Sequence, residues 1–190
     1  FSIILGRKYK GIDVREHGSG NPGGTNSLRF LGKKIGLWVL FLDALKAMII
    51  VLLVKIGIFD SLVAETGVEL FHPLAYGVAA AVGHVYSIYI KFKGGKAVAC
   101  TVGMMVGFNI IYAVIMALAF FIILKTWKFV SVASTGAVFT LVVIGAINGI
   151  VGNGWEITFF GFLLLLLVSF RHKKNFKNIK DGNEPKVTWI

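Results

Sequence analysis

Residues 97–124 read AVACTVGMMVGFNIIYAVIMALAFFIIL, a stretch of 28 positions without a charged side chain. A helix needs about 20 predominantly apolar residues to cross a bilayer. The stretch can therefore form one helix of ~42 Å, or two short helices that meet near Gly107, Phe108 and Asn109. The following loop, residues 125–128, carries two lysines. Two helices place these lysines on the same side as the other basic loops, as the positive-inside tendency favours, so we predict two.

The whole chain has the composition of a membrane protein. Of its 190 residues, 56% are hydrophobic and only 15% are charged, whereas soluble domains carry about 25% charge. This composition excludes a conventional soluble enzyme and a disordered chain. We predict an all-α fold, a single polytopic transmembrane helical bundle over residues 1–190 with about seven helices. Further spans are expected at residues 35–58, 68–90, 130–151 and 157–170, and residues 1–6 are expected to be the tail of a truncated first helix.

Positive charge gathers on one side of these spans. The chain has 20 Lys and Arg against 9 Asp and Glu, a net charge of +11, and in this topology only Lys46 and Lys55 lie away from the basic side. The positive-inside rule makes that side cytoplasmic. Because the cations lie in loops between apolar runs, they indicate loop orientation and an anionic ligand rather than nucleic acid.

Metal and disulfide chemistry have no sequence signature here. Cys100 is the single cysteine, which excludes a disulfide framework. The four histidines (His17, His72, His84 and His172) never occur with His-x-x-x-His spacing. We therefore predict neither a metal nor a cofactor.

The first basic loop contains the glycine-rich segment GSGNPGGTN at residues 18–26. Three of its glycines match G-x-G-x-x-G, but a charged stretch precedes them instead of an apolar strand, which argues against a dinucleotide site. Glycines let backbone N–H groups approach an anion closely, and the alternative is an ordinary turn at the membrane surface. The candidate phosphate ligands of this loop are Ser19, Gly20, Asn21, Thr25, Asn26 and the downstream Arg29.

A second loop, KFKGGK at residues 91–96, follows Gly83 and His84. Paired glycines beside lysines at a helix start suit a phosphate, because free N–H groups and the helix dipole both attract an anion. The alternative interpretation is a positive-inside anchor with a flexible turn. The candidate ligands are Lys96 and the backbone of Gly94 and Gly95.

A third loop begins with RHKKN at residues 171–175 and continues to Gly182 and Glu184. On a helix continuing from the last span, His172 and Asn175 share a face. A histidine there can act as a general base or bond a phosphate. The alternative is a charge cluster that binds anionic lipid headgroups, which we prefer for the outer lysines.

Two charged residues lie inside the second span. Asp43 and Lys46 are three residues apart, and intramembrane charges usually face the bundle interior as pairs. We expect a structural or site-supporting pair rather than direct catalysis.

The three loops, in this order and with these spans between them, resemble the bacterial acyl-phosphate:glycerol-3-phosphate acyltransferases, the PlsY family. Residues 19–29 are similar to its GSGN-x-G-x-TN element and arginine, residues 83–96 to its GH-x-(F/Y)…FKGGK element, and residues 171–184 to its RH-x-x-N…G-x-E element. The resemblance covers nearly the whole chain. The departures are Gly24 for alanine, Ser87 for proline, Ala97 for glycine, Cys100 for threonine, Phe176 for isoleucine and Asn178 for arginine.

The resemblance implies a multi-pass enzyme of the bacterial inner membrane with its active site facing the cytoplasm. It would transfer a fatty acyl group from acyl phosphate to the 1-hydroxyl of sn-glycerol 3-phosphate, giving lysophosphatidic acid and phosphate, the first step of phospholipid synthesis. Its partners would be these two substrates and membrane lipid, with no acyl-CoA, metal or cofactor. The expected catalytic residues are Ser19, Arg29, Lys96, His172 and Asn175. The expected substrate-binding residues are Gly20, Asn21, Thr25, Asn26, Gly94 and Gly95. Structural support is expected from Asp43, Lys46, His84 and Glu184.

Two rival functions are considered beside this one. A transporter or channel for an anionic solute would use the basic loops as a vestibule, but it predicts broken helices or charges near the midplane and often a repeat, and only Asp43 and Lys46 fit. An acyl-CoA-dependent acyltransferase would need His-x-x-x-x-Asp. No histidine here has an aspartate five residues later.

Overall fold

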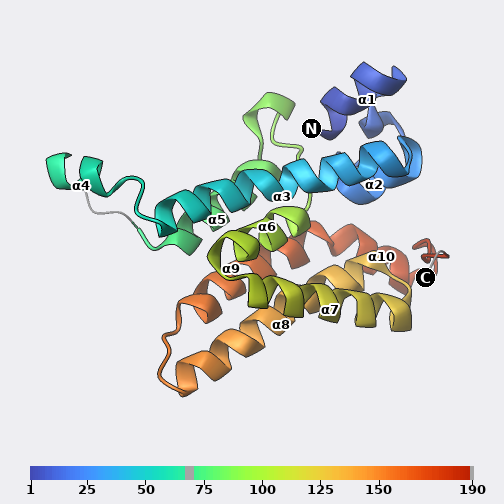
Figure 1. Ribbon diagram of the computed structural model, residues 1–190. Helices are drawn as coiled ribbons and strands as arrows, with labels where there is room; N and C mark the ends of the chain where they lie inside the picture. Colours follow the sequence, from blue (N-terminus) through green and yellow to red (C-terminus); the bar gives the residue numbers. More distant parts are fainter. Residues whose placement is uncertain (67–70, 189–190) are drawn as a thin grey trace.

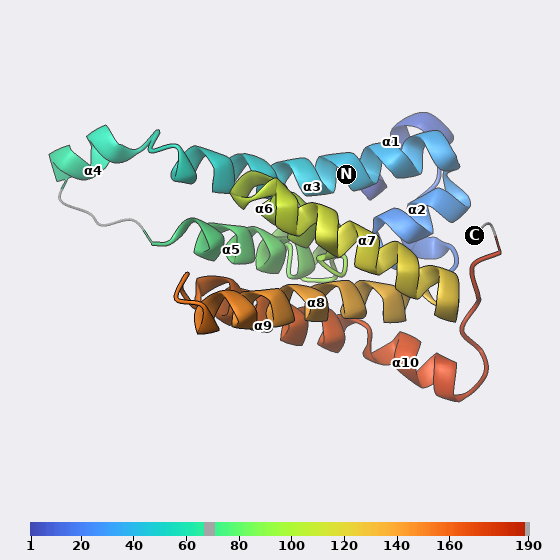
Figure 2. The ribbon, with the colours of Figure 1, turned by 60° about the horizontal axis from the view of Figure 1, so that its bottom comes forward.

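The computed structural model describes residues 1–66 and 71–188, and this part of the chain contains helices and no β-strand (Figure 1). The described helices are α1 (Ser2–Lys10), η1 (Val14–Glu16), α2 (Gly24–Phe30), α3 (Lys33–Lys55), α4 (Asp60–Thr66), α5 (Pro73–Val85), η2 (Ile88–Ile90), α6 (Val98–Phe108), α7 (Ile110–Trp127), α8 (Val130–Ile150), α9 (Glu156–Arg171) and α10 (Lys173–Lys180). Figure 2 shows α3, α5, α7, α8 and α9 running along a common direction as a bundle. The predicted all-α fold is confirmed.

Several helices are built to cross a membrane. Four helical stretches are long and apolar enough by length and composition, Lys33–Lys55, Pro73–Ile90, Ile110–Trp127 and Val130–Ile150. Their outer faces are apolar and exposed, as on α7, where the side chains of Ile111 and Ile122 are 62% and 67% exposed. A bilayer removes such faces from water, and helices satisfy their own backbone groups there. The shorter helices α1, α6 and α9 lie where the other three of the seven helices were predicted, so the number of helices agrees for the described residues, although these three fall short of the length of a full span.

The long apolar stretch is two helices, as predicted. Helix α6 ends at Phe108 and α7 begins at Ile110, with Asn109 in an extended conformation between them. The Asn109 side chain accepts a hydrogen bond from the backbone N–H of Ile111 at 3.0 Å, which caps the start of α7. The chain reverses at this point (Figure 1). Lys125, in the last turn of α7, and Lys128, directly after it, consequently lie at the end of the bundle that also holds α2 and α10 (Figure 2).

Small residues bring α6 against the middle of α3. A Cβ atom added to Gly103 would lie 1.9 Å from the backbone oxygen of Ala44, and one added to Gly107 would lie 2.5 Å from that of Met48. Such close backbone approach at glycine is the usual way in which membrane helices pack. It fixes the start of α6, and with it the loop that carries Lys96, beside α3.

The structure corrects two predicted boundaries. Pro73 starts α5 instead of lying inside a span, because proline lacks the N–H that a first helical residue does not need; residues 67–70, where that span was expected to begin, are outside the described residues. The helix after the last span is interrupted, since α9 ends at Arg171 and α10 starts at Lys173.

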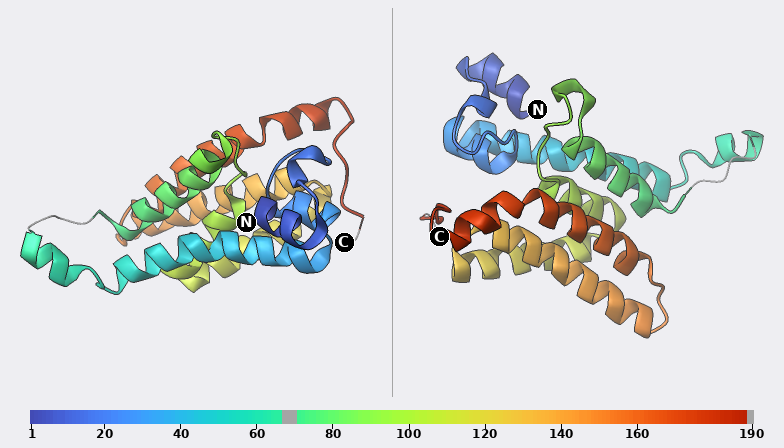
Figure 3. Two further views of the ribbon diagram at one scale, coloured as in Figure 1. Left: turned by 90° about the horizontal axis from the view of Figure 1, so that it is seen from above. Right: turned by 180° about the vertical axis from the view of Figure 1, so that it is seen from behind.

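Figure 3 shows how the two terminal segments relate to this bundle. Helices α1 and α2 lie beside the first part of α3, and the loop between α5 and α6 rises close to α1. Helix α10 and the C-terminal segment extend from α9 at the same end. A backbone hydrogen bond of 2.8 Å from Val187 N to Lys128 O ties that segment to the turn between α7 and α8.

Candidate active site

The second and third motifs meet through a chain of side-chain hydrogen bonds. Lys96, just before α6, donates from Nζ to Oδ1 of Asn175 on α10 at 2.5 Å. The amide of Asn175 donates to Oε1 of Glu184 at 2.6 Å, and Asn178 donates to the other carboxylate oxygen at 3.3 Å. Glu184 thus orients Asn175, and Asn175 orients Lys96.

Arg171 makes a second link between these motifs. Its Nε and Nη2 atoms donate to the backbone oxygens of Gly95 and Gly94 at 3.2 and 3.0 Å. The N–H groups of the two glycines point the other way, to Val85 O at 2.9 Å and His84 O at 3.3 Å. Backbone carbonyls therefore already accept from both N–H groups in this structure, and the expected contact of these groups with a phosphate stays a prediction.

The two glycines are needed for space instead. A Cβ atom on Gly94 would lie 2.0 Å from the backbone oxygen of His84, and one on Gly95 would lie 2.0 Å from Nε2 of the His84 ring. Only glycine lets this loop lie directly on the end of α5. The loop is thereby fixed at the depth where Lys96 reaches Asn175.

Lys96 is a largely buried cation. Burial lowers the pKa of its ammonium group to about 8, Glu184 opposes this shift, and Arg171 and Lys174 add to it. A cation partly stripped of water interacts more strongly with an incoming anion than an exposed one does. This makes Lys96 the strongest candidate for contact with a phosphate.

His172 stands at the junction of α9 and α10 and is only 3% exposed. Its Nδ1 atom lies 2.9 Å from the backbone oxygen of Val168, and because a carbonyl can only accept, Nδ1 carries the proton. Burial lowers the pKa of this imidazole to about 4, and the charges of Lys96 and Arg171 add to the shift. At neutral pH the ring is uncharged, so its Nε2 lone pair can accept a hydrogen bond from a hydroxyl.

The first motif is held mainly by its own bonds. Asn26, 4% exposed, donates its two amide hydrogens to the backbone oxygens of Val14 and His17 at 3.0 and 2.9 Å, and its Oδ1 accepts from Ser19 N at 3.4 Å. With all these groups engaged, Asn26 supports the loop rather than offering groups to a substrate. Gly18 leaves the room that this requires, since a Cβ there would strike the ring of Phe30 at 2.2 Å.

Other predicted ligands of the first motif face solvent. Ser19, Thr25 and Arg29 are exposed, and the Ser19 hydroxyl accepts only a long 3.4 Å bond from the backbone N–H of Asn21. Gly20 adopts a φ of +69°, which favours glycine. Within the described residues, no hydrogen bond joins this motif to the other two, although all three were predicted to lie on the same, basic side of the membrane.

The intramembrane pair of Asp43 and Lys46 lies under the second motif. Asp43 is 3% exposed, and Lys46 Nζ donates to its Oδ1 at 2.6 Å and to Nδ1 of His84 at 2.8 Å. The His84 ring in turn packs against Gly95. Three of the four side chains expected to give support thus form one network, and their mutual bonds offset the cost of burying charge.

Comparison with known proteins places the chain in a family. Residues 1–182 match the family model described as glycerol-3-phosphate acyltransferase. The glycerol-3-phosphate acyltransferases of Staphylococcus aureus strains Newman and bovine RF122 / ET3-1 are 37% and 38% identical over 190 residues, which is 99% of this chain and 91% of theirs. This chain belongs to the glycerol-3-phosphate acyltransferase family.

Two solved structures of PlsY, an integral membrane glycerol 3-phosphate acyltransferase, share the fold. The glycerol 3-phosphate form is 32% identical with a TM-score of 0.80, covering 98% of this chain and 90% of that one. The lysophosphatidic acid form is 31% identical with a TM-score of 0.77, covering 99% and 92%. The acyltransferase reading and the integral membrane fold both stand, and the transporter alternative is not supported.

Sequence reasoning missed two features of this acyltransferase. Arg171 was quoted as part of a motif but given no task, although it bonds two backbone oxygens. Asp13 was not noticed, yet it is 8% exposed and accepts from Arg15 and Arg7 at 2.6 and 2.8 Å. The Arg15 guanidinium above all, with Arg7, holds the pKa of the Asp13 carboxyl well below its usual range, against the effect of burial. The spacing of one acid between two arginines was the available signal.

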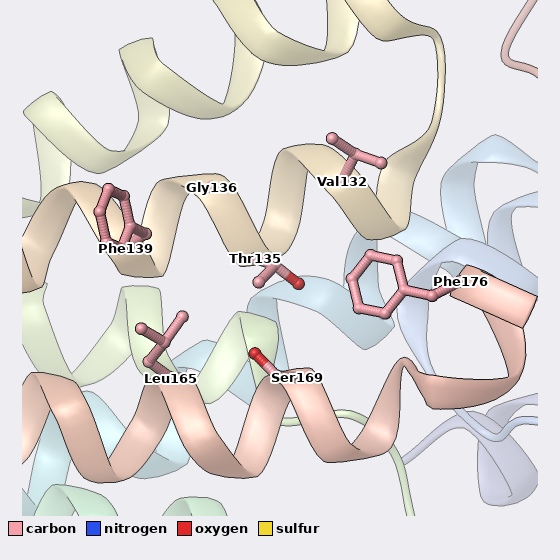
Figure 4. Close-up of a pocket in the computed structure, with 7 residues that line it drawn as sticks. All are labelled: Val132, Thr135, Gly136, Phe139, Leu165, Ser169 and Phe176. Atoms are coloured by element: carbon pink, nitrogen blue, oxygen red, sulfur yellow. The ribbon is translucent and has the colours of Figure 1, made fainter. Parts of the chain in front are cut away.

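A groove lies on the outer side of α8 and α9, with a volume of about 450 Å³. Figure 4 shows its lining residues, Val132, Thr135, Gly136, Phe139, Leu165, Ser169 and Phe176. Phe176 closes one end from α10 (Figure 4). The lining includes none of the predicted site residues, but Phe176 brings the groove next to the site, since its ring centroid lies 6.3 Å from that of His172.

Proposed function

We propose that this acyltransferase takes its acyl group from acyl phosphate and transfers it to the 1-hydroxyl of glycerol 3-phosphate, producing lysophosphatidic acid and inorganic phosphate. The observation that carries the proposal is the partly buried ammonium of Lys96, held by Asn175 where the second and third motifs meet. Both substrates carry a phosphate, and a site for them needs cations supplied from more than one segment.

An acyl phosphate suits a site of this composition. It is an activated acyl donor with a good leaving group, so positioning and charge stabilisation can suffice without a covalent acyl-enzyme. The hydroxyl oxygen attacks the carbonyl carbon and forms the new ester bond. The bond from that carbon to the phosphate oxygen breaks, and the hydroxyl proton passes to a phosphate oxygen. No cofactor or metal takes part in these steps.

Each candidate side chain has a task in this scheme. Lys96 faces the phosphate that leaves and stabilises the charge that develops there. The uncharged His172 accepts a hydrogen bond from the attacking hydroxyl through Nε2, and Asn175 keeps Lys96 in place.

The exposed residues of the first motif complete the scheme. Ser19, Thr25 and Arg29 are free to turn toward the glycerol 3-phosphate when it binds. Gly20 and Asn21 shape the loop that presents Ser19.

The basic residues at one end of the bundle indicate how the protein is oriented in the membrane. Helix α10 alone carries four lysines, and with α2 and the turn after α7 it forms the basic end of the bundle (Figure 2). The positive-inside rule assigns this end to the cytoplasm. We accordingly place the enzyme in the bacterial inner membrane as one domain, with its site open to cytoplasmic glycerol 3-phosphate and its acyl donor arriving from the lipid.

The test is a donor and acceptor assay on the purified protein in detergent or lipid. Phosphate release is measured with palmitoyl phosphate, with and without glycerol 3-phosphate, and thiol release is measured with palmitoyl-CoA as the alternative donor. Phosphate release that depends on glycerol 3-phosphate, with formation of lysophosphatidic acid and no use of the CoA donor, is expected. Transfer from palmitoyl-CoA alone would overturn the proposed donor.

A further inference from the structure

The peptide units of Gly94 and Gly95 are held along both edges. Their N–H groups bond to Val85 O and His84 O at the end of α5. Their carbonyl oxygens accept from the guanidinium of Arg171 at the end of α9, at 3.0 and 3.2 Å. One side chain therefore joins two helices through the loop that lies between them.

The backbone on either side of these glycines is strained. Lys91, Phe92 and Ala97 have φ angles of +52°, +61° and +65°, a left-handed conformation that residues with a Cβ rarely adopt. Each costs roughly 1–2 kcal/mol, so the loop does not keep this shape by local preference. Contacts from outside the loop have to hold it.

Arg171 and Asn175 are one helical turn apart across the junction of α9 and α10. Arg171 fixes the main chain directly before Lys96, and Asn175 accepts from the end of the Lys96 side chain. The segment from Arg171 to Asn175 thus fixes both the main chain next to Lys96 and the ammonium group at the end of its side chain. A guanidinium is suited to this because its rigid fork reaches two oxygens at once, which an ammonium cannot do.

We propose that Arg171 is a positioning residue for acyl transfer, which holds the Gly94 and Gly95 carbonyls so that Lys96 stays against Asn175. The proposal rests on the role of Lys96 in the proposed function. In this role Arg171 acts through Lys96 and contacts neither substrate. Loss of the guanidinium lets the loop relax from its strained shape and moves the ammonium away from the reacting phosphate.

A double-mutant cycle tests whether Arg171 acts through Lys96. Arg171→Gln is expected to lower kcat by about 10- to 100-fold, the effect of a displacement of about 1 Å in a catalytic group. In a Lys96→Gln background the same change is expected to cost less than twofold further, because residues that act as one unit are not additive. Full additivity of the two losses would overturn the proposal and give Arg171 an independent contact with substrate.

The pH profile separates the loss of the positive charge of Arg171 from the loss of the geometry of its guanidinium group. Three charged side chains shift the pKa of Lys96, of which Glu184 raises it, while Arg171 and Lys174 lower it. The wild type should lose kcat/KM as pH rises through about 8, where Lys96 loses its proton. In Arg171→Gln this alkaline limb should move to higher pH, and in Arg171→Lys it should stay near the wild-type position while kcat remains low.

Lys174→Gln is the matched control, because it removes a neighbouring cation that is exposed and makes no bond to the glycine loop. It should move the alkaline limb in the same direction and leave kcat within twofold. If Arg171→Gln fails to fold, as judged by size-exclusion and thermal unfolding in detergent, Arg171→Lys decides alone. A low kcat with an unmoved limb supports the proposal, and a wild-type kcat overturns it. An inactive wild type would count against the proposed function instead.

Discussion

The basic end of this molecule contains two regions that are held in different ways. In the region around Lys96, side chains from α9 and α10 bond to a loop between α5 and α6, so residues far apart in the chain fix one another. In the first motif, Asn26 bonds to the backbone of its own loop and Asp13 bonds to two nearby arginines. The first region is held by hydrogen bonds to helices distant in the sequence, whereas the polar side chains of the second bond mainly to nearby residues of the first 27 positions.

This difference separates two kinds of work that an acyltransferase must do. A group that stabilises a transition state has to be in place before the reaction, because reorganisation during the reaction costs rate. A loop that admits and releases a small substrate has to present exposed ligands and can complete the site when the substrate binds. The partly buried Lys96, held in place by Asn175, fits the first kind, and the exposed Ser19 and Arg29 fit the second.

The largest effect is expected from Lys96→Ala. Removing a preorganised charge that stabilises the transition state should lower kcat by about 10²- to 10³-fold, while the apolar bundle still folds. Phosphate release from palmitoyl phosphate and thermal unfolding in detergent check both parts. Lys93→Ala, at an exposed lysine of the same loop, is the control and should keep activity. Equal loss of folded protein in Lys96→Ala would make the lysine structural.

A second large effect is expected from Gly94→Ala. Its Cβ would lie 2.0 Å from the backbone oxygen of His84, so the loop must lift from α5 and carry Lys96 with it. We expect kcat/KM to fall by about 10²-fold, as for a displacement of about 1 Å. Gly83→Ala is the matched control, because nothing lies within 4 Å of its Cβ position. A fully active Gly94→Ala enzyme would show that the position of this loop does not limit the rate.

The sequence predicts the region around Lys96 only in part. The apolar run, the break at Asn109 and the side of the basic loops follow from hydrophobicity and charge, because the bilayer imposes both. The direction in which individual backbone N–H groups point does not follow from hydrophobicity or charge. Gly94 and Gly95 look like anion ligands by composition, yet their N–H groups face α5, since the approach of α5, α6 and α9 decides it.

The first motif shows a similar limit of sequence patterns. Asn26 has the residue type of a phosphate ligand, and only its buried position and its partners Val14 and His17 reveal a supporting role. The junction at His172 is likewise decided by tertiary packing and has no helix-breaking residue to mark it. Sequence patterns can predict which segments come together. They are less able to predict which atoms of those segments face the ligand.

A moderate effect is expected from Arg29→Gln in the first motif. Because Arg29 is exposed and is proposed to bind the acceptor, its loss should raise the KM for glycerol 3-phosphate about tenfold, as for one charge-assisted hydrogen bond of ~1.5 kcal/mol. The KM for palmitoyl phosphate and the alkaline limb of Lys96 should stay close to wild type. Lys34→Gln, another exposed cation nearby, serves as the control. A fall in kcat with an unchanged KM would place Arg29 with the reacting atoms and remove the contrast between the two regions.

The smallest effect is expected from Asp13→Asn, which weakens the frame of the first motif without touching the proposed ligands. The partner side chains of Arg7 and Arg15 are 62% and 38% exposed, so water compensates for much of the lost pairing, and the stability loss should be about 1 kcal/mol. Because the pKa of Asp13 is lowered in the folded protein, its contribution is present above the ordinary aspartate pKa and is lost as pH falls below it. Thermal unfolding should therefore separate the variant from wild type at pH 7, and the difference should shrink in acid. Asp181→Asn, at an exposed aspartate near the third motif, should show no such difference. A loss of kcat in Asp13→Asn as large as that in Gly94→Ala would mean that the first loop is as rigidly coupled to the reaction as the glycine loop is.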